Sequence, residues 1–238
     1  MPMVQHRQCA GQPTRPVAAP AVPRRTVAAD SMRAMRIVFD FAGVLFHWNP
    51  LRLVQRELPQ HAPDAASSAT VVQQIFEGYG GDWGDFDRGV LDVPELVERI
   101  CARSGLPHRG VRSVVEAVPM ELQPMPGTVS LLRRLHAQGR RLHYLSNMPA
   151  SYAEHLERAH DFIGCFDSGV FSSRVHAIKP EPQIYALAAQ RFGAQPAQLV
   201  FIDDVLDNVL AARQAGWQAV HFVDAADCEA QLRANDWI

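Results

Sequence analysis

The sequence predicts an α/β fold in which helices cover both faces of a doubly wound parallel sheet. Two observations support this fold class. From residue 126 onward, short runs of β-branched and aromatic residues alternate with segments of helical periodicity. Near the start, the apolar run Ile37–Phe39 suits a strand that is buried on both faces. Strands that alternate with helices form parallel sheets through right-handed crossovers.

Residues 1–34 precede the first predicted strand and are rich in Pro, Ala and Arg. They show neither strand nor helix periodicity, so we expect a disordered leader. Prolines interrupt the apolar stretch between Val17 and Val22, which therefore does not resemble the continuous core of a secretory signal.

Residues 49–124 follow the first strand and show no strand pattern, which predicts a helical insertion. Asp92 and Pro94 predict the start of one helix, and Gly105 predicts its end. The stretch 78–87 is dense in glycine and acidic residues, and we expect a loop there. Apolar residues at helical spacing predict helices over residues 50–58, 69–77, 93–104 and 110–118.

The rest of the chain supplies the remaining strands and helices of the predicted sheet. The pattern predicts strands over residues 141–145, 169–171, 199–202 and 219–223. It predicts helices over residues 129–138, 150–158, 182–193 and 207–215 between those strands.

Length and composition restrict the function classes. A chain of 238 residues has room for one sizeable core with a smaller inserted domain. A formal charge of −2 gives no electrostatic reason to expect binding to nucleic acid or to an anionic membrane. No apolar run approaches the roughly 18 residues of a membrane span. The four cysteines are scattered, which suggests reduced thiols and a cytoplasmic protein. The oligomeric state is not indicated.

Lys179 is the single lysine in a chain that has 22 arginines. A position that keeps lysine against this bias is expected to need a compact ammonium group rather than a planar guanidinium.

Polar side chains follow four predicted strands. Asp40 ends the first strand, Ser146 and Asn147 end the second, and Lys179 follows the third. The pair Asp203–Asp204 ends the fourth strand. Because the carboxyl ends of parallel strands lie at one edge of the sheet, we expect these side chains to converge.

Each of these motifs has a simpler interpretation when it stands alone. Asp40 could be a turn residue that caps nearby amides. Ser146 and Asn147 could cap the following helix. The pair Asp203–Asp204 is harder to explain in this way, because adjacent carboxylates repel one another unless a cation or a helix N-terminus compensates.

Three further acids, Asp82, Asp85 and Asp87, lie in the predicted loop of the insertion. We expect them to be solvated, although one of them could reach a substrate.

Taken together, the motifs resemble the haloacid dehalogenase-like (HAD) hydrolase superfamily over about residues 35–235. The resemblance implies a Rossmann-like core at residues 35–48 and 125–238, with an inserted helical cap at residues 49–124. Within the superfamily, the chain is most similar to small bacterial phosphatases that act on α-glucose 1-phosphate. This similarity rests on Gly43-Val44-Leu45, Trp48-Asn49-Pro50, Leu145-Ser146-Asn147, Lys179-Pro180-Glu181 and Asp203-Asp204.

The resemblance implies a Mg²⁺-dependent phosphatase that hydrolyses a small, sugar phosphate-like monoester. Asp40 would be the nucleophile and would form an aspartyl-phosphate. Asp40, Asp203, Asp204 and the backbone carbonyl of Ala42 would supply the oxygen ligands that suit Mg²⁺.

The remaining motif residues would bind and orient. Lys179 and the Ser146 hydroxyl would hold the phosphoryl oxygens, with the Asn147 amide beside them. Gly43 would allow the backbone to turn sharply and approach the ligand. Asn208 would orient Lys179 or an aspartate.

Ala42 departs from the usual superfamily pattern, which has a second aspartate two residues after the nucleophile. An alanine cannot transfer a proton, so an acid–base contribution of about 10²- to 10⁴-fold is missing from its usual place. The α-glucose 1-phosphate phosphatases have a small residue there. Phosphonoacetaldehyde hydrolases have alanine, but they need a lysine in the cap, and residues 49–124 contain none.

Two alternative functions stay open on the sequence alone. The first is a catalytically weak or inactive protein that binds a phosphorylated ligand or a protein partner, as Ala42 suggests. The second is a 2-haloacid dehalogenase. Dehalogenases of the superfamily also lack the second aspartate, but they dispense with the metal and with the acidic pair that Asp203 and Asp204 represent.

Overall fold

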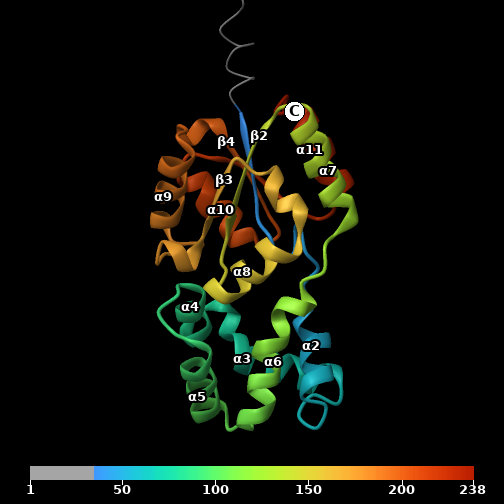
Figure 1. Ribbon diagram of the computed structural model, residues 1–238, viewed down its shortest axis with the longest axis vertical. Coiled ribbons are helices and arrows are strands. Elements are labelled where there is room, and N and C mark those ends of the chain that lie inside the picture. Colours follow the sequence, from blue (N-terminus) through green and yellow to red (C-terminus); the bar gives the residue numbers. More distant parts are fainter. Residues whose placement is uncertain (1–34) are drawn as a thin grey trace, which may run out of the picture.

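Five parallel strands form the sheet, as the sequence predicts, in a computed structural model that describes residues 35–238. The expected leader at residues 1–34 lies outside the described range. The strand order is β3-β2-β1-β4-β5, so the first strand of the chain is central (Figure 1). The strands are β1 (Arg36–Phe39), β2 (Arg141–Ser146), β3 (Ser168–Phe171), β4 (Leu199–Asp203) and β5 (Gln218–His221).

The central strand brings distant segments into register. Phe39 lies opposite Ile202 of β4, and the Asp40 amide donates a hydrogen bond of 2.9 Å to the Ile202 carbonyl. The next residues along both strands, Asp40 and Asp203, are therefore neighbours at the carboxyl edge of the sheet. The register thus brings together two carboxyl groups that are far apart in the sequence.

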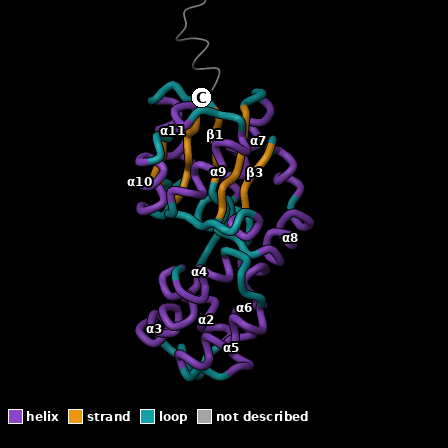
Figure 2. The backbone as a smooth tube through the Cα atoms, turned by 90° about the vertical axis from the view of Figure 1, so that its left-hand side faces the viewer, coloured by secondary structure: helices purple, strands orange, loops and turns teal. Residues whose placement is uncertain are grey.

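Helices cover both faces of the sheet, which gives the doubly wound arrangement (Figures 1 and 2). Alternation along β1 explains the two layers, because Ile37 and Phe39 face one core cluster and Val38 faces the other. Helices α7 (Pro126–Ala137), α8 (Ala150–Ala159) and α11 (Ala225–Ala234) pack on the first face. Helices α9 (Pro182–Phe192) and α10 (Leu206–Gln214) pack on the second.

A second, purely helical body lies beyond the carboxyl edge of the sheet (Figure 1). We refer to it as the cap, and we keep its boundaries at residues 49–124 as a proposal. No helix among residues 35–238 is long and apolar enough to cross a membrane. The cap helices are α2 (Pro50–Glu57), α3 (Ala65–Phe76), α4 (Gly81–Asp87), α5 (Val93–Ser104) and α6 (His108–Glu121).

The signals that predicted α5 act as expected. The Asp92 side chain accepts a hydrogen bond from the Glu95 amide, and the Glu95 side chain accepts one from the Asp92 amide. This capping box satisfies amide groups that the first helical turn leaves unpaired. Gly105 ends the helix in the left-handed region at φ 73°.

The prediction of a loop at residues 78–87 is wrong, because α4 occupies most of that stretch. Glycine disfavours helices, but Trp83 and Phe86 of α4 are buried. The Trp83 ring lies 4.4 Å from the ring of Phe76 in α3, and the Phe86 ring lies 5.5 Å from the ring of Tyr152 in α8. These aromatic contacts stabilise a helix that local propensity alone does not predict.

The sequence patterns also leave out α11 and the short 3₁₀ turns. The turns are η1 (Glu77–Tyr79), η2 (Asp161–Cys165), η3 (Ser172–Arg174) and η4 (Pro196–Gln198).

Candidate active site

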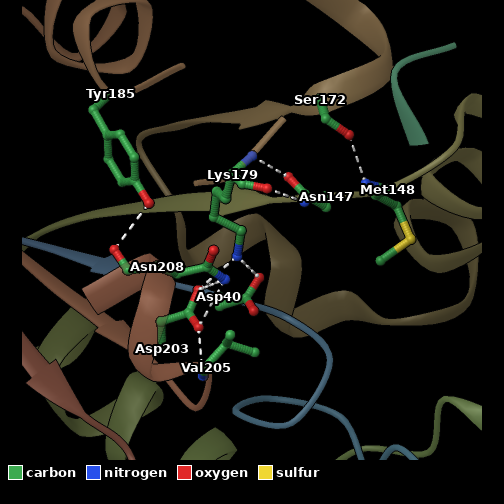
Figure 3. Close-up of polar contacts among 9 residues, drawn as sticks. All are labelled: Asp40, Asn147, Met148, Ser172, Lys179, Tyr185, Asp203, Val205 and Asn208. Atoms are coloured by element: carbon green, nitrogen blue, oxygen red, sulfur yellow. Dashed lines mark hydrogen bonds and ion pairs between the residues drawn. The ribbon is translucent and has the colours of Figure 1, made fainter. Parts of the chain in front are cut away.

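The ammonium group of Lys179 lies between two buried carboxylates at the carboxyl edge of the sheet (Figure 3). Lys179 Nζ is 2.8 Å from Asp40 Oδ1 and 2.7 Å from Asp203 Oδ2. Asp40 and Asp203 come from the ends of the neighbouring strands β1 and β4, whereas Lys179 comes from the loop after η3. All three side chains are buried, so water screens their charges only weakly.

Burial and mutual attraction oppose each other in this cluster. Burial raises the pKa of Asp40 to about 7, although the attraction of Lys179 opposes the rise. Burial also disfavours the charge on Lys179, but Asp203 and Asp40 outweigh this effect and raise its pKa. Lys179 therefore stays cationic throughout the neutral range.

Hydrogen bonds fix the position of Asp203. The Val205 amide donates to Asp203 Oδ1 at 2.8 Å, and Asn208 Nδ2 lies 3.1 Å from both carboxylate oxygens. The Tyr185 hydroxyl in turn donates to the backbone carbonyl of Asn208 at 2.9 Å (Figure 3). Of the two partners expected for Asn208, Lys179 and an aspartate, its side chain contacts the aspartate.

Three carboxylates are close enough together to hold one cation. Asp40, Asp203 and Asp204 can each offer an oxygen such that the three atoms lie within 4.8 Å of one another. Gly43 allows this approach, because a Cβ atom at this position would lie only 2.2 Å from Asp204 Oδ2. Asp40 and Asp203 are buried and Asp204 is accessible to solvent, and such a set of hard oxygen ligands fits Mg²⁺. Burial and the neighbouring Asp203 raise the pKa of Asp204, as expected where carboxylates are crowded without an added cation.

Ser146 and Asn147, at the end of β2, do not cap the next helix. Helix α8 has Pro149 at its N-cap position and no capping side chain. Instead, Asn147 Nδ2 donates to the Lys179 carbonyl at 3.0 Å, and the Lys179 amide donates to Asn147 Oδ1 at 2.8 Å (Figure 3). Asn147 therefore fixes the backbone that carries the lysine. Ser146 is buried beside the same cavity.

A cavity of about 250 Å³ lies over this cluster, between the sheet and the cap. Its floor includes Asp40, Ala42, Ser146 and Lys179. Its walls are largely aromatic and aliphatic and come from both bodies. They include Trp48, Tyr79, Trp83, Val118, Leu122, Met148 and Tyr152.

Comparison with known protein families agrees with this arrangement. The family model described as haloacid dehalogenase-like hydrolase matches residues 35–216. The chain belongs to the haloacid dehalogenase-like hydrolases. The expectations of this superfamily, of its fold and of a hydrolase are therefore confirmed.

Several curated relatives have phosphatase names. The chain is 28% identical over 197 residues to the sesquiterpene phosphatase astK of Aspergillus oryzae, a match that covers 82% of this chain and 93% of that protein. It is 26% identical over 197 residues to the phosphorylated carbohydrates phosphatase of Thermotoga maritima, covering 79% of this chain and 84% of that protein.

Solved structures of HAD-like enzymes share the fold. One is a HAD family enzyme from Bacteroides thetaiotaomicron in complex with magnesium and inorganic phosphate. It has a TM-score of 0.63 and 18% identity, and the match covers 82% of this chain and 98% of that chain. Another is an L-2-haloacid dehalogenase with a TM-score of 0.60 and 25% identity, covering 78% of this chain and 84% of that chain.

The three acids expected in the loop of the insertion lie in different surroundings, and the sequence patterns did not predict which of them would reach the cavity. Asp82 pairs with Arg103 at 3.4 Å, and the Asp85 side chain is 44% exposed, so both lie near the surface. The expectation of a solvated acid is wrong for Asp87, which is only 4% exposed and lines the cavity. The spacing of Trp83, Phe86 and Asp87 on one side of a helical turn was the available signal, and the expectation of a loop obscured it.

Proposed function

We propose that this HAD-like hydrolase hydrolyses phosphate monoesters with Asp40 as the nucleophile and Mg²⁺ as the cofactor. The position of the Lys179 ammonium between Asp40 and Asp203, with Asp204 beside them, is the observation that carries the proposal. A carboxylate nucleophile and a cation at the floor of a cavity suit a phosphoryl group, which is both electrophilic and anionic. The phosphatase-named relatives support the same reaction.

The reaction would proceed in two displacements. A carboxylate oxygen of Asp40 forms a bond to phosphorus while the bond to the alcohol oxygen breaks, which gives an acyl phosphate and the alcohol. Water then attacks the same phosphorus, the acyl phosphate bond breaks, and Asp40 is restored as inorganic phosphate forms. Each displacement has a lower barrier than direct hydrolysis of the ester.

Asp40, Asp203 and Asp204, together with the Ala42 carbonyl, would hold Mg²⁺. When bound, the ion supplies positive charge that stabilises the phosphoryl oxygens and lets the anionic nucleophile approach them. Asn208 would keep Asp203 in its ligating orientation through the bonds to both carboxylate oxygens.

The remaining predicted residues would bind the phosphoryl group. Lys179 would pair with its oxygens, and the Ser146 hydroxyl would donate to them. Asn147 would act mainly by fixing the Lys179 backbone, because its side-chain nitrogen and oxygen both already form hydrogen bonds with that backbone. Gly43 would keep the loop close to the ligand and leave room for Asp204.

For the substrate, we propose a small monoester such as a sugar phosphate, as the motifs suggest. The walls favour a second candidate, a terpenyl phosphate, because Trp83, Val118, Leu122 and Met148 offer apolar contact to the alcohol part of the ester. The sesquiterpene phosphatase relative supports this second candidate and the carbohydrate phosphatase relative supports the first. We propose the cytoplasm as the compartment, and the free cysteines Cys101, Cys165 and Cys228 support it.

The deciding experiment measures phosphate release from p-nitrophenyl phosphate, sugar phosphates and a prenyl phosphate, each with Mg²⁺ and with EDTA. We expect Mg²⁺-dependent release that is lost in Asp40→Asn. The preferred ester identifies the substrate class. No release from any ester by a folded protein would overturn the proposal in favour of a binding role, and metal-independent chloride release from 2-haloacids would overturn it in favour of a dehalogenase.

A further inference from the structure

The proposed reaction needs a proton donor that its usual position does not provide. If Asp40 is the nucleophile, the departing alkoxide must gain a proton, and Ala42 cannot supply one. Two other carboxyl groups line the cavity outside the Asp40, Asp203 and Asp204 cluster, and they belong to Asp87 and Asp207. Asp207 is exposed to solvent at the start of α10, whereas Asp87 is buried.

Asp87 is the last residue of α4, in the part of the cap that contacts the sheet body at η3 (Figure 1). It lines the same cavity as Asp40, Ala42 and Lys179. The cap therefore contributes a carboxyl-bearing residue to the cavity whose floor would bind the phosphoryl group.

The Asp87 carboxyl group has no hydrogen bond or ion pair within residues 35–238, although it is almost fully buried. Its oxygens are not among the fully buried side-chain atoms without a partner, so they keep access to the cavity that Asp87 lines. A carboxyl group in such a sparsely hydrated place is costly to charge. The charged groups that act on it are Lys179 and Asp40 from the sheet body. The titratable groups of Tyr152 in α8 and Tyr79 in η1 also lie near it, because burial and, to a smaller degree, the Asp87 charge raise the pKa of both tyrosines. Burial raises the pKa of Asp87 to about 8, although Lys179 opposes the rise. These surroundings therefore favour the protonated, neutral form of the carboxyl group.

The backbone of Asp87 is fixed to the sheet body. The Ser172 hydroxyl donates to the Asp87 carbonyl at 2.5 Å and accepts from the Met148 amide at 2.8 Å. The next residue, Arg88, forms two hydrogen bonds of 2.7 Å with Glu181. These contacts connect Asp87 to the loop after β2 and to the loop that carries Lys179, so its position relative to the floor is defined.

We propose that Asp87, supplied by the cap, is the general acid and base that replaces the aspartate missing at Ala42. In the first displacement, the protonated Asp87 transfers its proton to the leaving oxygen as the phosphorus–oxygen bond breaks, which releases a neutral alcohol. In the second, the Asp87 carboxylate accepts a proton from the attacking water as the acyl phosphate bond breaks. Asp40 is then ionised again and Asp87 is again protonated.

The test compares two leaving groups in Asp87→Asn, which keeps the shape of the side chain. The nitrophenolate of p-nitrophenyl phosphate is a good leaving group and needs no proton. The alkoxide of a sugar or prenyl phosphate is a poor leaving group and must be protonated as it departs. We expect kcat/KM for the alkyl ester to fall by about 100-fold or more, while kcat/KM for the aryl ester changes by less than about 10-fold. Retained aryl phosphorylation also shows that the variant is folded. Asp82→Asn, on the same helix but paired with Arg103 near the surface, is the matched control and should resemble the wild type with both esters.

The second displacement gives an independent readout. Because deprotonation of water also depends on Asp87, Asp87→Asn should release a burst of nitrophenol and accumulate a phosphorylated protein, seen as a mass increase after acid quenching. Ala42→Asp in the Asp87→Asn background should restore part of the alkyl ester activity. Restoration supports the proposal, because it shows that the missing function is proton transfer.

Different outcomes overturn different conclusions. An equal loss of kcat/KM for the two esters, or no loss for either, would overturn the role of Asp87 while the phosphatase reaction stands. Selective loss of alkyl ester turnover in Asp207→Asn would transfer the role to that residue. No phosphate release by the wild type, or full activity in Asp40→Asn, would overturn the proposed function and the role of Asp87 with it.

Discussion

Arg88 of the cap and Glu181 of the sheet body form a bidentate ion pair, with both hydrogen bonds at 2.7 Å. Each partner is close in sequence to a proposed functional position. Arg88 follows Asp87 directly, and Glu181 lies two residues after Lys179. The pair therefore connects the candidate acid of the cap to the loop that carries the cation of the floor.

Loss of this pair should affect catalysis more than stability. Both side chains are partly exposed, at 26% and 39%, so Arg88→Ala should lower the free energy of unfolding by less than about 1 kcal/mol. A small displacement of Asp87 should lower kcat/KM for an alkyl phosphate by about 10-fold or more, because proton transfer requires close alignment. Steady-state kinetics and urea unfolding of the same variant measure the two effects.

Arg174→Ala is the control for this prediction. Arg174 forms a similar bidentate pair with Glu157, at 2.9 and 2.7 Å, but both residues belong to the sheet body. A loss of kcat/KM in Arg174→Ala as large as in Arg88→Ala would contradict a specific role for the contact between the cap and the sheet.

Removal of the Lys179 charge should destabilise the protein strongly. In Lys179→Met, Asp40 and Asp203 would face one another without a cation, and we expect a loss of about 3–5 kcal/mol in the free energy of unfolding at pH 8. Because the folded state can relieve this repulsion by binding a proton, the loss should be smaller at pH 5. Urea unfolding in EDTA at both pH values measures it.

The control is Arg141→Met, which breaks the exposed ion pair between Arg141 and Asp167. In this variant the free energy of unfolding should fall by less than about 1 kcal/mol, and the loss should depend little on pH. An equal loss in the free energy of unfolding in the two variants would show that the buried ion pairs of Lys179 stabilise the protein no more than an exposed pair does.

Gly43→Ala should weaken binding of Mg²⁺ at the proposed site. The new Cβ atom would lie 2.2 Å from Asp204 Oδ2, so the carboxylate would have to move away from Asp40 and Asp203. We expect at least about a 10-fold increase in the Kd for Mg²⁺ by titration calorimetry, equivalent to about 1.4 kcal/mol.

Gly139→Ala separates the steric effect from backbone strain. Gly139 has φ 71°, close to the 83° of Gly43, but a Cβ atom added there would meet no surrounding atom within 4 Å. Both variants should lose some stability because alanine disfavours positive φ. A weakened affinity for Mg²⁺ in Gly139→Ala would argue against the contact with Asp204.

Protonation of Asp87 should appear in the pH dependence of stability. An acid with a pKa of 3.8 when unfolded and about 8 when folded keeps its proton in the folded state across that interval. The unfolded state binds fewer protons there, so Asp87 makes the free energy of unfolding fall as the pH rises, by up to about 1.4 kcal/mol per pH unit.

Asp87→Asn removes this dependence because its amide does not titrate. In EDTA, the Tm of Asp87→Asn should therefore rise relative to that of the wild type as the pH increases from 5 to 8. The Tm of Asp85→Asn should change with pH in the same way as the Tm of the wild type. A constant difference in Tm between Asp87→Asn and the wild type from pH 5 to 8 would contradict a buried, protonated Asp87.

Sequence patterns predicted the sheet better than they predicted the cap. All five strands were expected near their observed positions, because buried parallel strands appear as apolar runs bounded by turn residues. Helix α4 was missed because Gly81 and Gly84 disfavour a helix locally, and the packing of Trp83 against Phe76 overrides that preference.

By itself, the sequence determined which chemical groups stand at the carboxyl edge of the sheet. Asp40, Lys179 and the pair Asp203–Asp204 follow their strands, and parallel strands all end at that edge. Only the tertiary structure decided that Asp87 belongs to the same cavity. Its position is fixed by the hydrogen bond from Ser172 to its backbone carbonyl and by the pair of Arg88 with Glu181, and both Ser172 and Glu181 lie more than 80 residues further along the chain. The pKa of a carboxyl group is set by the surroundings that exclude water from it, and no local pattern in the sequence specifies those surroundings.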